Sequence, residues 1–329
     1  MADLSTTYLG LSLASPLVPS ASPLAYDLDT IRRMEDAGAA AIVLPSLFEE
    51  QLADGADLFL THGTYLEPDA MADATVFRSG PTEYVEHVRR AREAVHIPII
   101  ASLNGVARGA WTTRARDIQQ AGADALELNV CFLPTDPFLE SAEIEQEYVD
   151  LLREVLENAT IPVAVKLTPF LTNVASMCRR LDHAGASGLV LFNAFNQPDI
   201  DLDRCEFVPR ATLSQAGALR LPLSWTSILY GRVKASLAAN GGIQSAEDVL
   251  KLILVGADVT MLASELIRNG IGRLTAIRTD LERWMDEHGY ASLREFRGRL
   301  SQQSVPHPAI FERVSYVRAV SSLDYLTPA

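Results

Sequence analysis

The sequence predicts an α/β protein and, more narrowly, a (β/α)8 TIM barrel. Four segments share one short pattern, in which a helix end is followed by a Gly-Ala step and then by a run of apolar residues. Glycine directly after a helix adopts the left-handed conformation that ends it. An unbroken apolar run is typical of a parallel strand buried on both faces. The glycines are Gly38, Gly122, Gly185 and Gly256, and the runs are Ala40–Leu44, Ala125–Asn129, Gly188–Phe192 and Val259–Leu262.

Further strands are expected between these four. The candidates are Pro16–Ser20, Ile97–Ser102, Ile161–Leu167 and Ala235–Ala239. Eight strands that alternate with helices predict a barrel whose active site lies at the carboxyl ends of the strands. The residues at those ends are therefore the ones to inspect for chemistry.

The segments between the strands have the spacing of amphipathic helices. In the first, Ile31 and Met34 fall on one face, and in a later one Ser245 stands where an N-cap is preferred, ahead of acidic residues in the first turn. The expected helices are Asp27–Ala37, Thr82–Val95, Glu143–Leu156, one from Ser245 to Leu254, Leu274–Met285 and Leu293–Leu300.

Three connections are too long to be simple loops. Residues 45–81, 131–142 and 193–234 follow the second, fourth and sixth strands. Insertions at these strand ends build substrate walls in barrel enzymes, although contacts between subunits would explain them equally well. No low-complexity linker interrupts the sequence, so residues 1–329 are expected to form a single domain.

The composition limits the classes of partner. The chain of 329 residues has a formal net charge of −14, which opposes binding to nucleic acid or to an anionic membrane. Neither a secretion signal nor a membrane-spanning stretch is recognisable. The three cysteines, Cys131, Cys178 and Cys205, lack Cys-x-x-Cys spacing, so no zinc or iron–sulfur site is expected. We expect a cytoplasmic protein that acts on a small molecule and holds no metal.

Lys166 is the most informative residue at a strand end. A lysine inside an apolar strand must meet an anion or lose its proton, because burying an unpaired ammonium group is costly. It could be a Schiff-base nucleophile, half of a structural ion pair, or a cation opposite negative charge that develops on a ligand.

The loops after the seventh and eighth strands predict a phosphate site. They contain Asn240-Gly241-Gly242 and Ala263-Ser264. Barrels commonly bind phosphate here through backbone amides and a helix N-terminus, and consecutive glycines let amides converge on an anion. The helix that begins after Ser245 would add its dipole. An ordinary glycine-rich turn is the alternative for either loop alone.

Uncharged polar groups occupy the remaining strand ends. The third, fourth and sixth strands end near Asn104, Asn129 and Asn193. Their amides both donate and accept hydrogen bonds, as the edge of a flat heterocycle requires. Ser20-Ala21-Ser22 after the first strand is small enough to let a ligand approach the backbone.

In order and spacing, these residues resemble the dihydroorotate dehydrogenase family of FMN-dependent barrels over most of the chain. The segments that carry the resemblance are Ala21-Ser22, Leu128–Val130, Val165–Pro169, Asn193, Ala238–Gly242, Gly256-Ala257 with Ala263-Ser264, and Tyr290–Gly298. The resemblance implies that FMN is the cofactor, that Asn129 and Lys166 contact its isoalloxazine ring, and that Asn129 and Asn193 face the substrate. The implied cofactor contacts are Ala21, Ser22, Asn104, Asn129, Lys166, Asn240, Gly241, Gly242, Ala263 and Ser264.

Two departures from the family pattern affect substrate chemistry. Aligned without a gap, the catalytic base position holds Phe132, which cannot take a proton. Cys131 lies one residue earlier and is our candidate base if a bulge turns it inward. Asp136, otherwise a turn residue, and His62 are alternatives. Pro45 stands where the family has a lysine that helps to bind flavin and substrate.

The leading hypothesis is therefore an FMN oxidoreductase that oxidises dihydroorotate or a related dihydropyrimidine, as in pyrimidine biosynthesis. A hydride would pass from C6 of the substrate to N5 of the flavin while a base takes a proton from C5. The alternatives are a flavin-binding accessory protein, an FMN enzyme with another substrate, and a phosphate-ester isomerase or synthase. A homodimer is compatible with the sequence, which does not identify an electron acceptor.

Overall fold

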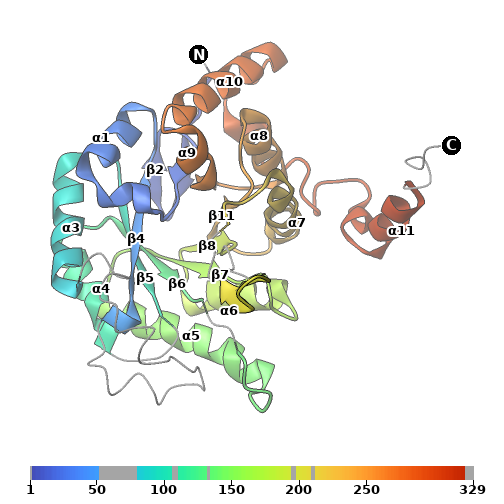
Figure 1. Ribbon diagram of the computed structural model, residues 1–329. Coiled ribbons are helices and arrows are strands. Elements are labelled where there is room, and N and C mark those ends of the chain that lie inside the picture. The colour runs from blue at the N-terminus through green and yellow to red at the C-terminus, as the bar shows by residue number, and fades with distance from the viewer. Residues whose placement is uncertain are drawn as a thin grey trace.

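Eight parallel strands form a nearly closed barrel in the computed structural model, which describes residues 2–51, 80–105, 110–131, 134–193, 198–208 and 212–322 (Figure 1). The hydrogen-bonded order is β3-β12-β11-β8-β7-β6-β5-β4. Next to the seam, the Ala40 amide ahead of β4 donates to the Leu17 carbonyl of β3 at 2.9 Å. The strands are β3 (Leu17–Pro19), β4 (Ile42–Phe48), β5 (Ile99–Asn104), β6 (Ala125–Asn129), β7 (Val163–Leu167), β8 (Gly188–Leu191), β11 (Ser236–Asn240) and β12 (Val259–Leu262). The predicted barrel and its strands are confirmed.

Helices surround the strands (Figure 1). They are α1 (Leu28–Asp36), α3 (Pro81–Ala94), α4 (Ala110–Gln120), α5 (Ser141–Asn158), α6 (Val174–Ala184), α7 (Arg220–Leu229), α8 (Ala246–Val255), α9 (Ser264–Asn269), α10 (Arg273–His288) and α11 (Arg313–Ser322). Ser245 caps α8 as expected, because its side chain accepts from the Asp248 amide while the Asp248 carboxylate accepts from the Ser245 amide.

The four glycines of the repeated pattern behave as predicted. Gly38, Gly122, Gly185 and Gly256 have φ values of 99°, 99°, 108° and 119°. Gly185 and Gly256 are the C-caps of α6 and α8, and their amides donate to carbonyls in the last helical turn. The left-handed residue reverses the chain direction, so the buried strand can begin three or four residues later.

The strands divide the apolar side chains between two cores. In β6, Leu126 and Leu128 belong to the layer between the strands and the helices, whereas Ala125 points into the barrel. A hairpin of β1 (Thr6–Tyr8) and β2 (Leu11–Leu13), which the sequence did not predict, adds Tyr8 and Leu9 to the inner core. The Leu9 amide donates to Ser236 Oγ at the start of β11, so the hairpin closes the amino-terminal end of the barrel.

The predicted helix at Leu293–Leu300 is wrong. Only Leu293–Glu295 forms a 3-10 turn (η5), and Gly298 has a φ of 76°. The amides of Gly298 and Leu300 donate to the carbonyls of Ile253 and Leu254, at 3.0 and 2.8 Å. These bonds satisfy groups at the carboxyl end of α8, and they take the amides that a helix would need internally.

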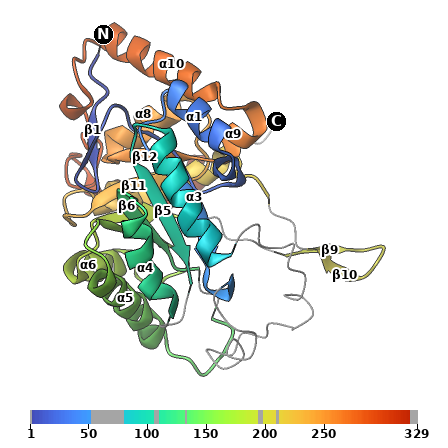
Figure 2. The same cartoon turned by 90° about the vertical axis from the view of Figure 1, so that its left-hand side faces the viewer.

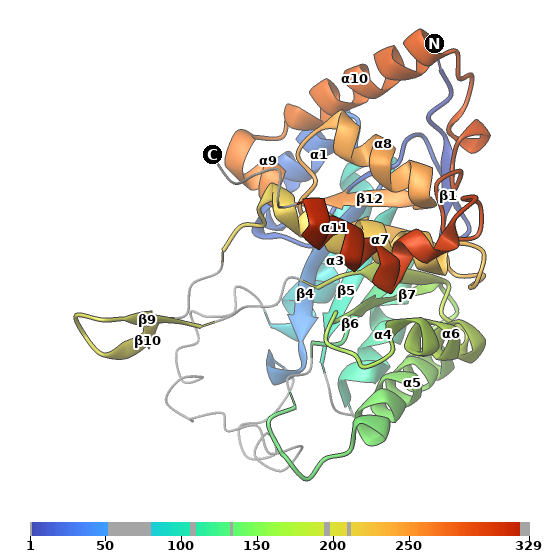
Figure 3. The ribbon, with the colours of Figure 1, turned by 90° about the vertical axis from the view of Figure 1, so that its right-hand side faces the viewer.

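The predicted connection after the sixth strand contains more structure than expected. Residues 193–234 include a hairpin of β9 (Asp199–Asp201) and β10 (Glu206–Val208), the 3-10 turn η4 (Ala216–Leu219) and α7. The hairpin stands away from the barrel (Figures 2 and 3). Of the predicted connection 45–81, residues 52–79 lie outside the described part of the chain, as do residues 132 and 133 in 131–142.

Gly188 at the start of β8 leaves room for Leu9 of the hairpin to pack against the barrel. A Cβ atom here would lie 2.4 Å from Cδ2 of Leu9. We expect Gly188→Ala to destabilise the protein by about 1–3 kcal/mol, the usual cost of overpacking a core. The free energy of unfolding in denaturant measures this.

The matched control is Gly272→Ala, since a Cβ there meets no atom within 4 Å and φ is −56°. Equal effects of the two substitutions would show that the hairpin is not packed against Gly188.

Candidate active site

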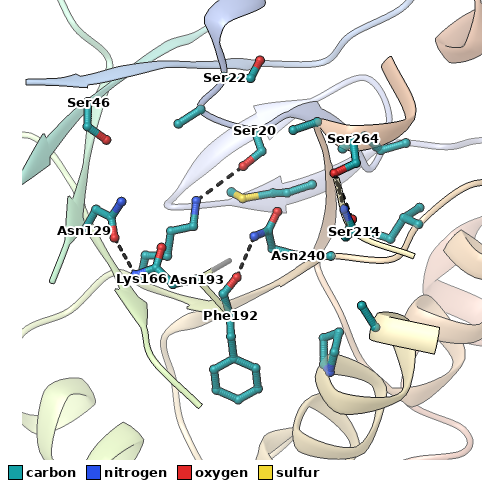
Figure 4. Close-up of a pocket in the computed structure, with 18 of the residues that line it drawn as sticks. Ser20, Ser22, Ser46, Asn129, Lys166, Phe192, Asn193, Ser214, Asn240 and Ser264 are labelled. Carbon is teal, nitrogen blue, oxygen red and sulfur yellow. Dashed lines mark hydrogen bonds between the residues drawn. The ribbon is translucent and has the colours of Figure 1, made fainter. Parts of the chain in front are cut away.

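A cavity of about 470 Å³ opens at the carboxyl ends of the barrel strands (Figure 4). This volume lies within the usual range for small-molecule sites. The structure brings nearly every predicted site residue to its wall. The lining includes Ser20, Ala21, Ser22, Pro45, Ser46, Phe48, Asn104, Asn129, Lys166, Asn193, Ser214, Asn240, Gly241, Gly242, Ala263 and Ser264.

A buried ion pair forms the floor of this cavity. Nζ of Lys166 in β7 lies 3.2 Å from Oε1 of Glu127 in β6, and the two side chains are only 6% and 1% exposed. Lys166 Nζ also donates to Ser20 Oγ at 3.4 Å, which Figure 4 shows. The ion-pair interpretation of Lys166 is therefore confirmed, and the same ammonium group reaches the cavity.

The other carboxylate oxygen of Glu127 is buried as well. Within the described part of the chain, Oε2 is buried without a hydrogen-bond partner, as is the hydroxyl of Tyr8. Burial raises the pKa of Tyr8 well above its usual value, and the negative charge of Glu127 raises it further. Sequence reasoning did not identify Glu127, although an acidic residue within the apolar run Ala125–Asn129 was a signal.

The loops after β11 and β12 meet at one end of the cavity, where Ser214 joins them. The Gly242 amide donates to Ser214 Oγ at 3.2 Å. Ser214 in turn donates to Ser264 Oγ, from its amide at 2.9 Å and from its hydroxyl at 3.0 Å. Ser214 therefore links the two loops, and the Ser264 hydroxyl hydrogen is the donor that these bonds leave for a ligand.

Gly242 is required here by close packing. Its φ is 73°, and a Cβ atom would lie 2.3 Å from the Leu219 amide nitrogen in η4. This approach positions the segment that carries Ser214. Ser214 was not predicted, since it lies 28 residues before Gly242 in a connection without a recognisable motif. The amides of Gln244 and Ser245 ahead of α8 donate to Asp248, and the expected contribution of the α8 dipole stays a prediction.

Asparagines line the other side of the cavity. Nδ2 of Asn193 donates to Oδ1 of Asn129 at 2.5 Å. Nδ2 of Asn240 donates to the Phe192 carbonyl at 2.6 Å, and Asn104 ends β5 at the cavity wall. The three predicted strand-end asparagines, Asn104, Asn129 and Asn193, therefore surround one space, as expected.

His87 makes a hydrogen bond to the backbone of the segment that follows β3. Nε2 of His87 in α3 lies 2.8 Å from the Ala25 carbonyl, three residues after Ser22. Burial lowers the pKa of His87, so the neutral imidazole that donates to this carbonyl is favoured. His87 thus fixes the backbone that lines the cavity near Ala21 and Ser22.

None of the described candidate bases lies among the residues that line the cavity. Cys131 is exposed and is not among the residues that line the cavity, so its role stays a prediction. Oδ1 of Asp136 accepts from the Phe138 amide at 2.9 Å, which confirms a turn residue. Phe132 and His62 lie outside the described residues. Pro45 is buried in the cavity wall.

The described ranges also bear on metal binding and on membrane insertion. Across these ranges, no group of three or more His, Cys, Asp or Glu residues is arranged to hold a metal ion. Within the same ranges, no helix has the length and hydropathy to cross a membrane.

The chain is similar in sequence to proteins of a known family. The family model for dihydroorotate dehydrogenase matches residues 77–285. The catalytic subunit of dihydroorotate dehydrogenase B (NAD(+)) from Thermoplasma volcanium is 24% identical over 304 residues, which cover 91% of this chain and 98% of that protein. Dihydroorotate dehydrogenase A (fumarate) from Limosilactobacillus reuteri is 26% identical over 302 residues, 87% and 94% of the two chains.

A third relative carries a different name. The NAD-dependent dihydropyrimidine dehydrogenase subunit PreA from Escherichia coli K12 is 23% identical over 329 residues, which cover 92% of this chain and 78% of that protein. The matched range 77–285 includes the strands from β5 to β12. It therefore contains the ion pair and the two loops with Gly241-Gly242 and Ala263-Ser264.

The buried ion pair predicts non-additive effects on stability. Lys166→Met leaves the Glu127 carboxylate buried without a cation, so we expect a loss of about 3–5 kcal/mol in the free energy of unfolding. The double variant Lys166→Met/Glu127→Leu should recover most of this loss, because apolar residues of similar size replace both charges. Denaturant unfolding of the single and double variants measures the coupling. A double variant destabilised by the sum of the single effects would contradict the pairing.

Proposed function

The chain belongs to the dihydroorotate dehydrogenase family, as its sequence pattern predicted, and from this premise we propose that it is an FMN-dependent dehydrogenase. The proposed reaction is oxidation of a CH–CH bond in dihydroorotate or a related dihydropyrimidine. The observation that carries the proposal is one cavity in which the loops after β11 and β12 meet Ser214 at one end, a buried lysine lies at the floor, and uncharged amides line the wall.

The residues present fit FMN. A phosphate bound here would take the donors of Gly242, Ser214 and Ser264 from the hydrogen bonds that these groups make to one another. Gly241, with a φ of 106°, has no atom within 4 Å of the place of a Cβ, so its backbone leaves room at this end. The cavity continues from here to Lys166 and the asparagines.

Lys166 and the asparagines would bind and orient the rings. When bound, FMN would supply the acceptor for a hydride at N5. The Lys166 ammonium group would stabilise negative charge on the pyrimidine edge of the flavin, because preorganised charge in a dry site needs little reorganisation. Asn129 and Asn193 would hold the substrate through hydrogen bonds.

A base must take the proton from C5 as the hydride leaves C6, so that the C5–C6 double bond forms. Cys131 is our candidate, and it would have to turn toward the cavity. Since general-base assistance is worth about a hundredfold to ten-thousandfold in rate, we expect dihydroorotate oxidation to be slow while Cys131 stays outside. A flavin-binding accessory protein is the second candidate, favoured by the absence of Cys131 from the described lining.

The phosphate assignment predicts loss of flavin on introduction of a negative charge. Ser214→Asp places a carboxylate where the phosphate is proposed to bind, so the purified variant should lose its visible flavin absorption. Ser224→Asp on the exposed side of α7 is the matched control and should stay yellow. A fully loaded Ser214→Asp protein would place the phosphate elsewhere.

The role of Cys131 predicts a loss of turnover without loss of flavin. Cys131→Ala should lower the rate of flavin reduction by substrate about a hundredfold or more, because the base is removed. Anaerobic stopped-flow absorbance measures this rate. The exposed Cys205→Ala variant controls for general effects of removing a thiol. Unchanged reduction in Cys131→Ala would assign the base to another residue, with Asp136 and His62 tested next.

A further inference from the structure

We propose that a groove on the outside of the barrel, between α5 and α6, binds the phosphate group of a small phosphorylated molecule. The two helices pack side by side, as Figures 2 and 3 show. The groove has a volume of about 390 Å³, which lies within the usual range for small-molecule sites. Among the described residues it shares no lining residue with the cavity at the barrel mouth, so this site is separate from that of the proposed function.

Basic side chains from both helices line this groove. The lining consists of Gln146, Val149 and Arg153 of α5 with Arg179, Arg180, His183 and Ala184 of α6. Residues three and four positions apart share one face of a helix, so the members from each helix form a row along the groove. Three guanidinium groups and an imidazole are therefore gathered in one place, on a chain whose formal net charge is −14.

Arg180 is held in place by two contacts to α5. Its Nη1 lies 2.8 Å from Oε2 of Glu145, and its Nη2 donates to Oε1 of Gln146 at 2.8 Å. Nε2 of Gln146 donates in turn to Oδ1 of Asp150 at 2.8 Å. These bonds join the two helices and fix one wall of the groove before a ligand arrives, which lowers the entropy cost of binding.

Arg153 and Arg179 are the groups that we expect to meet the phosphate. Nη1 of Arg153 is 3.6 Å from Oδ1 of Asp150, and the Arg153 side chain is 60% exposed, so this contact contributes little and can be exchanged for a ligand. Arg179 is exposed on α6, and its carbonyl accepts from Nδ1 of His183 at 2.7 Å, which ties the imidazole to the same helical turn. The forks of two guanidinium groups match the oxygens of a phosphate.

A structural role at the helix ends explains only part of this cluster. Basic side chains in the last turn of a helix interact favourably with its dipole, and His183 occupies that turn in α6. Arg179 lies before that turn. The last turn of α5 holds no basic residue, and Arg153 stands more than one turn before Asn158, where that helix ends. The groove therefore gathers positive charge that the helix dipoles do not require.

The chemistry of the groove favours a phosphate ester over other anions. A phosphate ester carries a charge of about −1.5 to −2 at neutral pH and three acceptor oxygens, so it can use more than one guanidinium group. Val149 and Ala184 add apolar surface for the carbon skeleton that bears the phosphate. Nucleic acid is a poor occupant, because the net charge of the chain opposes a long polyanion.

The first test compares ribose 5-phosphate, ribose and inorganic phosphate by isothermal titration calorimetry of the purified protein in a chloride buffer. We expect ribose 5-phosphate to bind and ribose not to bind. Inorganic phosphate should bind more weakly than the ester, because it has no carbon skeleton to contact Val149 and Ala184. Binding of neither phosphate compound overturns the inference. Equal affinities for the two would identify the free anion as the ligand and overturn the assignment to a phosphorylated molecule.

Substitutions locate the bound phosphate. Arg179→Gln and Arg153→Gln should each weaken binding of ribose 5-phosphate by about tenfold or more, since each removes a charge-assisted hydrogen bond. Both side chains are exposed, so both variants should unfold in denaturant like the wild type. Arg33→Gln on α1 is the matched control, because it removes the charge of an exposed arginine on another helix, and it should bind like the wild type. Unchanged binding in either groove variant, or an equal loss in Arg33→Gln, overturns the inference.

A hexaglutamate peptide separates a small molecule from an acidic segment of another protein. We expect the peptide to bind more weakly than ribose 5-phosphate, because each of its carboxylates carries a single charge and two acceptor oxygens. Tighter binding of the peptide that is lost in Arg179→Gln would identify an acidic protein segment as the occupant and overturn the inference. None of these measurements involves flavin, so their outcome is independent of the proposed function.

Discussion

The ion pair between Glu127 and Lys166 is the constraint around which the interior of this barrel is organised. Ala125 and Ala164 occupy the inward positions two residues before Glu127 and Lys166 on the same strands. Each charge needs the other, since either alone would be buried without compensation. The pair lies between the apolar inner core and the polar cavity at the carboxyl ends of the strands. The hairpin that carries Tyr8 closes the opposite end of that core.

This arrangement also determines what Lys166 can do. A lysine held by a carboxylate at 3.2 Å and by Ser20 is a fixed, oriented cation. That suits stabilisation of negative charge on a bound ring. The same carboxylate that orients Lys166 also limits the positive charge available to a substrate.

The two ends of the cavity depend on different kinds of structure. The floor is built from strands, whose inward positions are fixed by the pleat and by the register of β6 with β7, in which Asn129 is opposite Lys166. The end formed by Gly242, Ser214 and Ser264 is built from connections. It is complete only when η4 packs on Gly242 and brings Ser214 to Ser264. A rigid floor and an end assembled from loops are what barrel enzymes combine to bind a cofactor at a fixed reacting position.

By itself the sequence determined the elements of the barrel and most of the residues at its mouth. Buried parallel strands require apolar runs, left-handed helix ends require glycine, and strand ends converge, so Lys166, Asn129 and Gly242 could be assigned to one site before any coordinates. Only the tertiary structure decided which side chains form hydrogen bonds and ion pairs with each other. Glu127 meets Lys166 across 39 residues and Ser214 meets Ser264 across 50, and local patterns carry no information about pairs at such separations. The predicted helix at Leu293–Leu300 failed for the same reason, because distant carbonyls at the end of α8 offered its amides better partners than the helix itself.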